Sequence, residues 1–267
     1  MFTQAGGSVF EGNFRVVIPA RFDSTRLPGK VLLDIAGKPM IQHVWERAVS
    51  SGAGEIVVAT DNDRVAEVAN GFGATVCMTS PACTSGTDRV AEVCDRLGWD
   101  NISPVVNVQG DAPLILPASI RRVAELLLRN PEASLATLCV AIKSVQEYSD
   151  PNVVKVVFDR AGRAMYFSRA PIPSGGHGQD QDNVWRQAWR HLGLYAYKID
   201  PLRILSQTPP CLLEQTERLE QLRAMWLGMT IMIEPDEGAH GPDVDTAQDL
   251  ARVAAILRDE ALSRVQQ

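Results

Sequence analysis

Short β-branched segments alternate with amphipathic segments along the chain from Phe14 onward. Between the apolar runs, apolar residues recur at every third or fourth position, which is the period of an α-helix. This alternation is typical of βαβ units and predicts an α/β fold with a Rossmann-like, mostly parallel sheet. The predicted strands of the first half are Arg15–Pro19, Glu55–Thr60, Ala74–Met78, Val105–Gln109 and Leu135–Ala141.

Helices are predicted between these strands. In Pro39–Ser51, apolar residues such as Met40 and Val44 share one face, and Gly52 follows where a helix commonly ends. The same period predicts helices over Asp61–Gly71 and Gly86–Leu97.

The second half of the chain is less regular. Val153–Phe158 and Arg163–Phe167 flank a short turn and alternate polar with apolar residues, which predicts a β-hairpin in a smaller mixed α+β lobe. Pro171–Asn183 is rich in Gly and Pro and predicts a mobile loop over a site. Further predicted elements are strands at His191–Lys198 and Thr230–Glu234 and helices over Leu213–Leu227 and Asp245–Asp259.

These elements predict four regions. Residues 1–13 have no basic n-region and no apolar stretch, so we expect a flexible leader rather than a secretory signal. An α/β core follows at 14–150, then the mixed lobe at 151–229. A strand and helix at 230–267 are expected to return to the core.

Composition excludes several classes of protein. The 267 residues include 26 basic and 32 acidic side chains, and the pI is near 5.3, which disfavours binding to nucleic acid or an anionic membrane. No apolar run approaches the roughly 18 residues of a membrane span. The five cysteines form no C-x-x-C pair, so we expect free thiols in a reducing cytoplasm.

The loop after the first predicted strand carries the strongest chemical signal. Pro19–Lys30 contains the cations Arg21, Arg26 and Lys30. In a parallel sheet this loop lies at the carboxyl edge, where ligands bind, and the three cations suit a triphosphate. The alternative is a solvated basic loop whose cations pair with nearby aspartates. The loop is neither a Walker loop nor a dinucleotide fingerprint, and the lack of the latter counts against a dehydrogenase.

Two aspartates are candidate ligands for Mg²⁺. Asp111 follows Gln109-Gly110 at the end of a predicted strand, so it also emerges at the carboxyl edge. Carboxylate oxygens beside bound phosphates are what Mg²⁺ prefers. Asp245 is the second candidate, although the residues alone favour a role in capping the helix that follows it.

Ser85-Gly86-Thr87-Asp88-Arg89 begins a predicted helix, where Ser85 or Thr87 can cap the first turn. A cation such as Arg89 is unfavourable there against the helix dipole. A bound anion or carbonyl would relieve that cost, which favours a functional role for Arg89.

In their order and spacing, several motifs together resemble one family. They are Ile18-Pro19-Ala20-Arg21, Ser24-Thr25-Arg26-Leu27-Pro28-Gly29-Lys30, Val58-Ala59-Thr60-Asp61, Ser85-Gly86-Thr87-Asp88-Arg89, Asn107-Val108-Gln109-Gly110-Asp111, Phe167-Ser168-Arg169, Arg190-His191-Leu192-Gly193, Leu219-Glu220-Gln221-Leu222-Arg223 and Val244-Asp245-Thr246. The chain resembles the nucleotidyltransferases that activate acidic sugars, and among them the 3-deoxy-D-manno-octulosonate (Kdo) cytidylyltransferases.

The resemblance implies an activity, a cofactor and partners. CTP and Kdo would give CMP-Kdo and pyrophosphate, with Mg²⁺ as cofactor, for lipopolysaccharide or capsule synthesis. It also implies that the core binds the nucleotide, and that the lobe binds the sugar and forms a homodimer, to which the strand of Tyr195 and Tyr197 contributes.

The resemblance further assigns roles to individual residues. The nucleotide would be bound by Pro19, Ala20, Arg21, Arg26, Lys30, Ser85, Arg89 and Gln109. The catalytic set would be Arg21, Lys30, Asp111 and Asp245, with Asp111 and Asp245 as the metal ligands. The sugar would be bound by Arg169, His191, Tyr195, Glu220 and Gln221, any of which, taken singly, is more often a solvated or locally paired side chain.

Two positions depart from the family pattern. Ala112 stands where Glu is usual after Gly-Asp, and Asp243 stands where Gly is usual before Val-Asp-Thr. These departures keep open a related acceptor, such as 8-amino-Kdo or a nonulosonic acid. A nucleotide-sugar binding protein without catalysis is the alternative from another class, and loss of Lys30, Asp111 or Asp245 would favour it, but all three are present.

Overall fold

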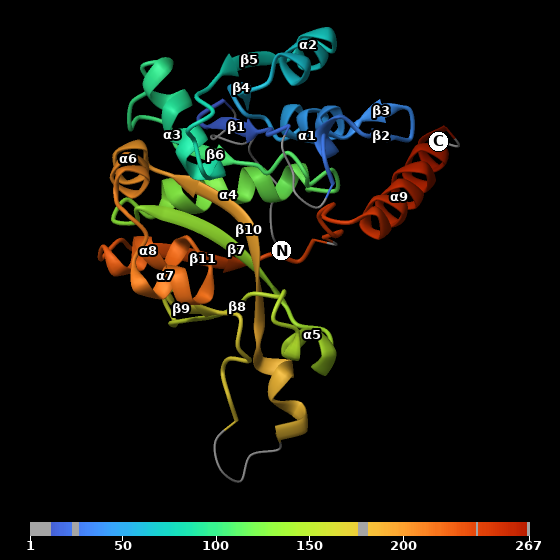
Figure 1. Ribbon diagram of the computed structural model, residues 1–267. Coiled ribbons are helices and arrows are strands. Elements are labelled where there is room, and N and C mark those ends of the chain that lie inside the picture. The colour runs from blue at the N-terminus through green and yellow to red at the C-terminus, as the bar shows by residue number, and fades with distance from the viewer. Residues whose placement is uncertain (1–11, 23–26, 176–180, 239, 266–267) are drawn as a thin grey trace, which may run out of the picture. The chain divides into compact units, whose positions relative to one another are not determined.

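The protein is described by a computed structural model over residues 12–22, 27–175, 181–238 and 240–265 (Figure 1). The chain divides into two compact units: a first unit, Met1–Arg121 with His240–Gln267, and a second unit, Arg122–Ala239. This division differs from the predicted limit at residue 150, and the roles given to the four predicted regions stay predictions. Most of the predicted leader lies outside the described residues.

The first unit contains a parallel sheet in the strand order β6, β1, β4, β5. The strands are β1 (Arg15–Pro19), β4 (Glu55–Thr60), β5 (Thr75–Met78) and β6 (Val105–Asn107). Val17, Val57 and Val106 are fully buried, as expected where both faces of a parallel sheet are covered. Since β6 ends at Asn107, two residues before the predicted limit, Gln109 and Asp111 follow the strand rather than lying within the ladder.

Helices and short elements surround this sheet. They are the 3₁₀ turn η1 (Lys30–Leu32), the hairpin of β2 (Asp34–Ile35) and β3 (Lys38–Pro39), and the helices α1 (Met40–Val49), α2 (Asp63–Gly71), α3 (Gly86–Arg96) and α9 (Ala247–Val265). Helix α4 (Pro117–Arg129) contains the boundary between the units. In sequence, α9 comes last, but Val244, Val253 and Leu257 pack with Ile35, Met40 and Leu114 in one apolar cluster of the first unit.

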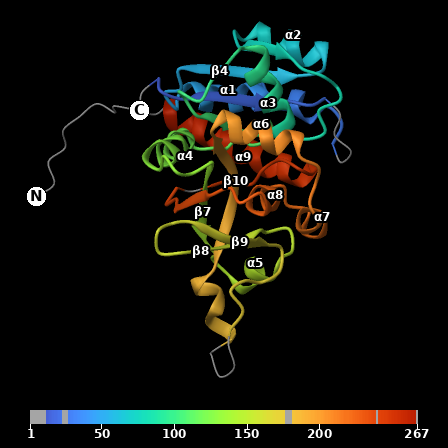
Figure 2. The same ribbon diagram turned by 90° about the vertical axis from the view of Figure 1, so that its left-hand side faces the viewer.

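The second unit is built on strand β7 (Leu135–Ala141), which pairs in parallel with β11 (Ile231–Pro235) and antiparallel with β10 (Trp189–Tyr197). The predicted hairpin is confirmed as β8 (Lys155–Phe158) and β9 (Ala164–Ser168), and β8 also pairs with β10. Figures 1 and 2 both show β10 as a long curved strand with η2 (Gln181–Gln187) at one end and α6 (Ile199–Gln207) at the other. A short helix, α5 (Val145–Ser149), follows β7 in sequence. Of the predicted loop 171–183, residues 176–180 lie outside the described residues.

One predicted element of the second unit is wrong. Leu213–Leu227 is not a single helix but two, α7 (Leu212–Glu217) and α8 (Gln221–Trp226). The chain turns between them because Arg218 adopts a left-handed conformation, with φ of 54°. Trp226, at the end of α8, is 63% exposed.

The five cysteines are free thiols, as predicted, and Cys94, Cys139 and Cys211 are buried. None of the helices in the described ranges is both long and apolar enough to cross a membrane.

Candidate active site

Three predicted residues that are far apart in sequence meet in the first unit. The ammonium of Lys30 donates hydrogen bonds to a carboxylate oxygen of Asp111, to Asp245 Oδ1 at 3.2 Å and to the carbonyl oxygen of Val244 at 3.2 Å. The Lys30 side chain is 14% exposed, whereas those of Asp111 and Asp245 are 25% and 41% exposed. The carboxylates thus keep contact with solvent beside a largely buried cation.

Asp111 is held by the turn that follows β6. Gly110 packs against the end of β1, and a Cβ at this position would lie 2.7 Å from the carbonyl oxygen of Pro19. Glycine is therefore required for the backbone to approach this closely. The backbone N–H of Val244 donates to the carbonyl of Asp111 at 2.9 Å, so the segment before α9 is fixed directly beside this turn.

The N-terminus of α9 is capped by residues other than Asp245. The hydroxyl of Thr246 accepts from the N–H of Asp249 at 3.2 Å, and the Asp249 carboxylate accepts from the N–H of Thr246 at 2.9 Å. This reciprocal pair is a capping box. The capping role that the residues alone favoured for Asp245 therefore falls to Thr246, and the Asp245 carboxylate contacts Lys30.

Lys30 is held in its charged form. Burial by itself lowers the pKa of Lys30, but the adjacent carboxylates of Asp111 and Asp245 outweigh burial, and the pKa is raised. A lysine placed this way stays positive across the physiological pH range and supplies a fixed charge.

The other predicted residues of the first loop differ in how exposed they are. Pro19 ends β1, and Ala20 is fully buried with its N–H donating to the carbonyl of Ala59 at 2.8 Å. Arg21 is exposed at the carboxyl edge of the sheet. Arg26 lies outside the described residues.

Three predicted nucleotide-binding positions lie together at this edge. A Cβ on Gly86 would lie 3.3 Å from Gln109 Nε2 and 3.5 Å from Pro19 Cγ, so the start of α3 adjoins both side chains. The Gln109 amide donates to Asn107 Oδ1 at 3.2 Å, which orients it. The Ser85 hydroxyl accepts from the N–H of Asp88, and the Asp88 carboxylate accepts from the N–H of Ser85, so Ser85 is the N-cap of α3.

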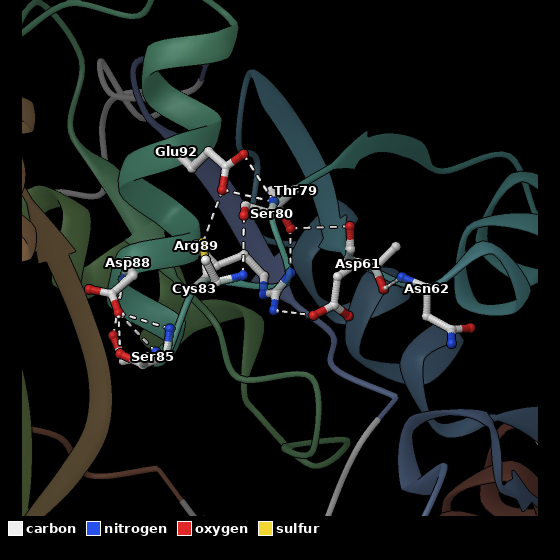
Figure 3. Close-up of polar contacts among 12 residues, drawn as sticks. Asp61, Asn62, Thr79, Ser80, Cys83, Ser85, Asp88, Arg89 and Glu92 are labelled. Carbon is white, nitrogen blue, oxygen red and sulfur yellow. Dashed lines mark hydrogen bonds and ion pairs between the residues drawn. The ribbon is translucent and has the colours of Figure 1, made fainter.

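Arg89 has protein partners of its own (Figure 3). Its guanidinium is 1% exposed; it donates to Asp61 Oδ2 at 2.7 Å and to the hydroxyl of Thr79. Asp61 and Thr79 follow β4 and β5, so Arg89 ties the ends of two strands to the first turn of α3. The anion that offsets the helix dipole is a carboxylate of the protein itself.

Glu92, one turn further along α3, holds the loop before that helix (Figure 3). Its carboxylate accepts from the N–H of Ser80 at 2.9 Å and from Cys83 Sγ at 2.9 Å. Burial and the Glu92 carboxylate raise the pKa of the Cys83 thiol to about 12, so this cysteine is not a nucleophile at neutral pH.

In the second unit, His191 and Tyr195 lie on β10 beside each other. Their ring centroids are 5.2 Å apart, and the Phe167 ring packs edge-on against His191, with centroids 5.0 Å apart. The register of β10 against β7 shifts between Leu192 and Tyr195, and the hydroxyl of Thr137 fills this irregularity. Burial lowers the pKa of His191 to about 3, which keeps the imidazole neutral.

The contacts of Thr137 define the tautomer of His191. The Thr137 hydroxyl lies 2.8 Å from the carbonyl of Leu194, 3.1 Å from that of Leu192 and 2.9 Å from His191 Nε2. A hydroxyl has one proton, and two carbonyls compete for it. His191 Nε2 therefore donates to Thr137, which leaves Nδ1 as an acceptor. Among the described residues, the buried Tyr195 hydroxyl has no hydrogen-bond partner within the chain.

Arg169 borders the turn between α7 and α8. Its guanidinium donates to the carbonyls of Glu217 at 2.8 Å and Pro151 at 3.0 Å, and its N–H donates to the Glu217 carboxylate at 2.9 Å. Glu220 and Gln221 follow this turn; Glu220 is half-buried, and Gln221 is buried.

Several polar residues that organise these groups were not predicted from the sequence. They are Thr79, Glu92, Thr137, Lys155 and Glu217. Asp61 belongs to the motif Val58-Ala59-Thr60-Asp61, but no partner was predicted for it. Lys155 did carry a signal, because it interrupts the apolar run Val153–Phe158 at a position that the structure buries.

Comparisons with known proteins agree with one another. The family described as Cytidylyltransferase matches residues 15–231. The 3-deoxy-manno-octulosonate cytidylyltransferase of Thioalkalivibrio sulfidiphilus is 50% identical over 92% of this chain and 99% of the relative. That of Coxiella burnetii is 49% identical over 91% of this chain and 99% of the relative. A solved structure of CMP:2-keto-3-deoxy-manno-octonic acid synthetase complexed with CTP matches with a TM-score of 0.85 and 42% identity, over 92% of this chain and 99% of that one. The predicted α/β class is thereby confirmed.

Proposed function

The chain belongs to the cytidylyltransferase family, and we propose that it transfers the cytidylyl group of CTP to Kdo, forming CMP-Kdo and releasing pyrophosphate. The observation that carries the proposal is the cluster of Lys30, Asp111 and Asp245, which places a fixed cation between two carboxylates in a chain half identical to such enzymes. A binding protein without catalysis would not need this arrangement.

The nucleotide subsite is proposed at the carboxyl edge of the parallel sheet. Arg21, Arg26 and Lys30 would bind phosphate oxygens, since guanidinium and ammonium groups are the side chains that bind phosphate most strongly. The base and ribose would lie near the turns after β1 and β6 and the start of α3, where Pro19, Ala20, Ser85 and Gln109 are grouped. Arg89 would act on the nucleotide through the loop ends that it holds.

Asp111 and Asp245 fit a divalent cation. Both are carboxylates, both retain solvent exposure, and both reach the same ammonium, so their oxygens converge on one region. In the described ranges no group of three or more His, Cys, Asp or Glu side chains is placed to hold a metal, so the set suits Mg²⁺, which keeps waters and binds substrate phosphates. When bound, Mg²⁺ would supply positive charge that polarises the phosphate oxygens.

The reaction is an in-line phosphoryl substitution. The anomeric 2-hydroxyl of the sugar forms a bond to the α-phosphorus, the bond from that phosphorus to the pyrophosphate oxygen breaks, and the hydroxyl proton passes to water. Negative charge builds up on the leaving pyrophosphate. Lys30, with Arg21 and Arg26, would stabilise that charge, and fixed cations of this kind contribute several kcal/mol to lowering a barrier.

The acidic sugar would bind in the second unit. His191 Nδ1 is a neutral acceptor for a sugar hydroxyl, and the Tyr195 hydroxyl is a buried group in need of a partner. Glu220, Gln221 and Arg169 would complete this subsite with a carboxylate, an amide and a cation. A homodimer and a cytoplasmic location follow from the family resemblance and the free cysteines, and both stay predictions.

Pyrophosphate release tests the proposal. The full chain is incubated with CTP, UTP, ATP or GTP, each with Kdo, 8-amino-Kdo or a nonulosonic acid, with and without Mg²⁺. Release with CTP and Kdo that requires Mg²⁺ supports the proposal, and a preference for another acid corrects the acceptor. No release with any pair would favour a binding protein.

A further inference from the structure

Lys155 is a buried cation that pairs with no carboxylate among the residues that the structure describes. It begins β8 and is fully buried, with 0% of its surface exposed. Its ammonium donates to three backbone carbonyls: Asp150 at 2.9 Å, Val153 at 2.6 Å and Arg169 at 2.6 Å. Three donors matched to three acceptors satisfy the whole ammonium group.

Burial of the Lys155 ammonium couples it to the backbone segments that accept its hydrogen bonds. Burial lowers the pKa of Lys155, an effect that the nearby charge of Asp150 only partly opposes. The three carbonyls offset this cost only while they point at the ammonium together, so Lys155 and the two segments it joins constrain one another. These segments are the 150–153 turn and the end of β9.

The same turn also holds Arg169 and β10. The carbonyl of Pro151 accepts from the Arg169 guanidinium at 3.0 Å, and the carbonyl of Val154 accepts from the N–H of His191 at 2.8 Å. Residues 150–155 therefore contact two of the proposed sugar-binding residues through the backbone.

Arg169 and its neighbour Ser168 also hydrogen-bond to the turn between α7 and α8. The guanidinium donates to the carbonyls of Glu217 and Arg218, and Ser168 donates to the Glu217 carboxylate at 2.6 Å. Arg218 is in the left-handed region, where a non-glycine residue is strained unless its surroundings hold it. Glu220 and Gln221 follow two and three residues later, and α8 contacts β9 (Figure 1).

We propose that Lys155 is a positioning residue for the acidic-sugar subsite, which it organises by joining the 150–153 turn to Arg169 and so to the turn that presents Glu220 and Gln221. This role rests on the proposed function of the chain. Lys155 itself does not contact substrate, because its three donors are occupied by the backbone.

Loss of Lys155 is expected to affect the two substrates differently. Lys155 and the segments it holds all belong to the second unit, whereas the nucleotide residues belong to the first. Misplacement of binding groups by about 1 Å is enough to reduce rates by ~100-fold. We therefore expect loss of Lys155 to act on the sugar and not on CTP.

The test compares Lys155→Met with a control, Leu202→Ala, by steady-state kinetics on the full chain. Leu202 is fully buried in α6, an element of the same unit that does not include the 150–155 segment, and its truncation removes packing. Lys155→Met should raise the KM for Kdo by ~10-fold or more, with the KM for CTP within ~2-fold of wild type. Leu202→Ala should lower the Tm and leave both KM values within ~2-fold.

An unchanged KM for Kdo in folded Lys155→Met, or an equal rise in both KM values, would overturn the positioning role. If Lys155→Met does not fold, Glu217→Gln tests the same turn, because it weakens the anchor of Ser168 and Arg169. A KM for Kdo in that variant within ~2-fold of wild type would likewise overturn the proposal. Failure of the proposed function is seen separately, as wild-type protein that releases no pyrophosphate.

Discussion

Replacing Lys30 with methionine removes the cation of the candidate site while keeping a chain of similar length. Asp111, Asp245 and the carbonyl of Val244 then lose the donor that they share. Two carboxylates are left side by side with no positive charge between them, and the leaving pyrophosphate loses one of its proposed cations.

The magnitudes separate an effect on catalysis from an effect on folding. A hydrogen bond to a charged group contributes about 1.5–3 kcal/mol to stability. Because Asp245 is 41% exposed and screened by solvent, we expect the lower end of that range for the variant. A domain with the usual stability of about 5–15 kcal/mol stays folded after this loss. Removing a fixed charge from a transition state instead costs about 2.7–4 kcal/mol, or ~100- to 1,000-fold in kcat.

The assay measures pyrophosphate release for kcat and KM, and urea unfolding for stability. Lys38→Met is the matched control, since Lys38 is a lysine of the same unit that pairs with Glu46, at 2.6 Å, instead of with Asp111 or Asp245. The control should stay within ~2-fold of wild type, because exposed ion pairs contribute about 0–1 kcal/mol. A folded Lys30→Met variant with kcat/KM within ~3-fold of wild type would refute the assignment of Lys30.

Three further predictions concern charge and capping. Burial lowers the pKa of His191 from 6.5 to about 3, so the unfolded chain binds a proton between these pH values that the folded chain does not. The free energy of unfolding is therefore highest above pH 6.5 and falls toward pH 3 by up to about 1.4 kcal/mol per pH unit. The difference in this free energy between pH 7 and pH 5, measured by urea unfolding, should be smaller in His191→Asn than in the wild type. An equal difference would contradict the account. Asp61→Asn should lower the free energy of unfolding by about 3 kcal/mol, because it leaves the buried Arg89 guanidinium without its counter-charge. The control Arg96→Met, which removes the exposed Arg96–Glu92 pair, should lower it by about 0.5 kcal/mol or less. Similar losses in the two variants would contradict the role of Asp61. Thr246→Ala should destabilise the chain by about 1 kcal/mol and leave kcat within ~2-fold of wild type, because it removes only the cap of α9. Asp245→Asn should instead lower kcat and leave the cap intact. A loss of stability without a loss of kcat in Asp245→Asn would show that Asp245 is a structural residue.

Local pattern predicted most of the secondary structure. The limits of β1, β4 and β7 match the predicted strands residue for residue, because each is a short, largely apolar and β-branched run of the length of a strand. The break between α7 and α8 had no such signal, since neither Gly nor Pro stands at Arg218. Its carbonyl is bound by Arg169, 49 residues away in sequence, and that contact exists only in the folded unit.

The candidate site was predictable in its charges and not in its pairings. Lys30 lies in the loop that follows β1 and Asp111 in the turn that follows β6, at the edge of the sheet where topology brings ligand-binding groups together. For Arg89 the helix dipole predicted a bound anion or carbonyl, but the structure supplies Asp61, 28 residues away. Sequence spacing gives no information on which of several carboxylates a buried cation will meet, because that depends on the register of neighbouring strands.

Product analysis tests the central claim most directly. The full chain is incubated with CTP, Kdo and Mg²⁺, and the products are identified by mass spectrometry alongside quantified pyrophosphate. We predict a CMP-sugar ester and pyrophosphate in equal amounts with the wild type, and neither with Asp111→Asn. Pyrophosphate without the ester, or unchanged CTP in the presence of every acidic sugar tried, would contradict the account.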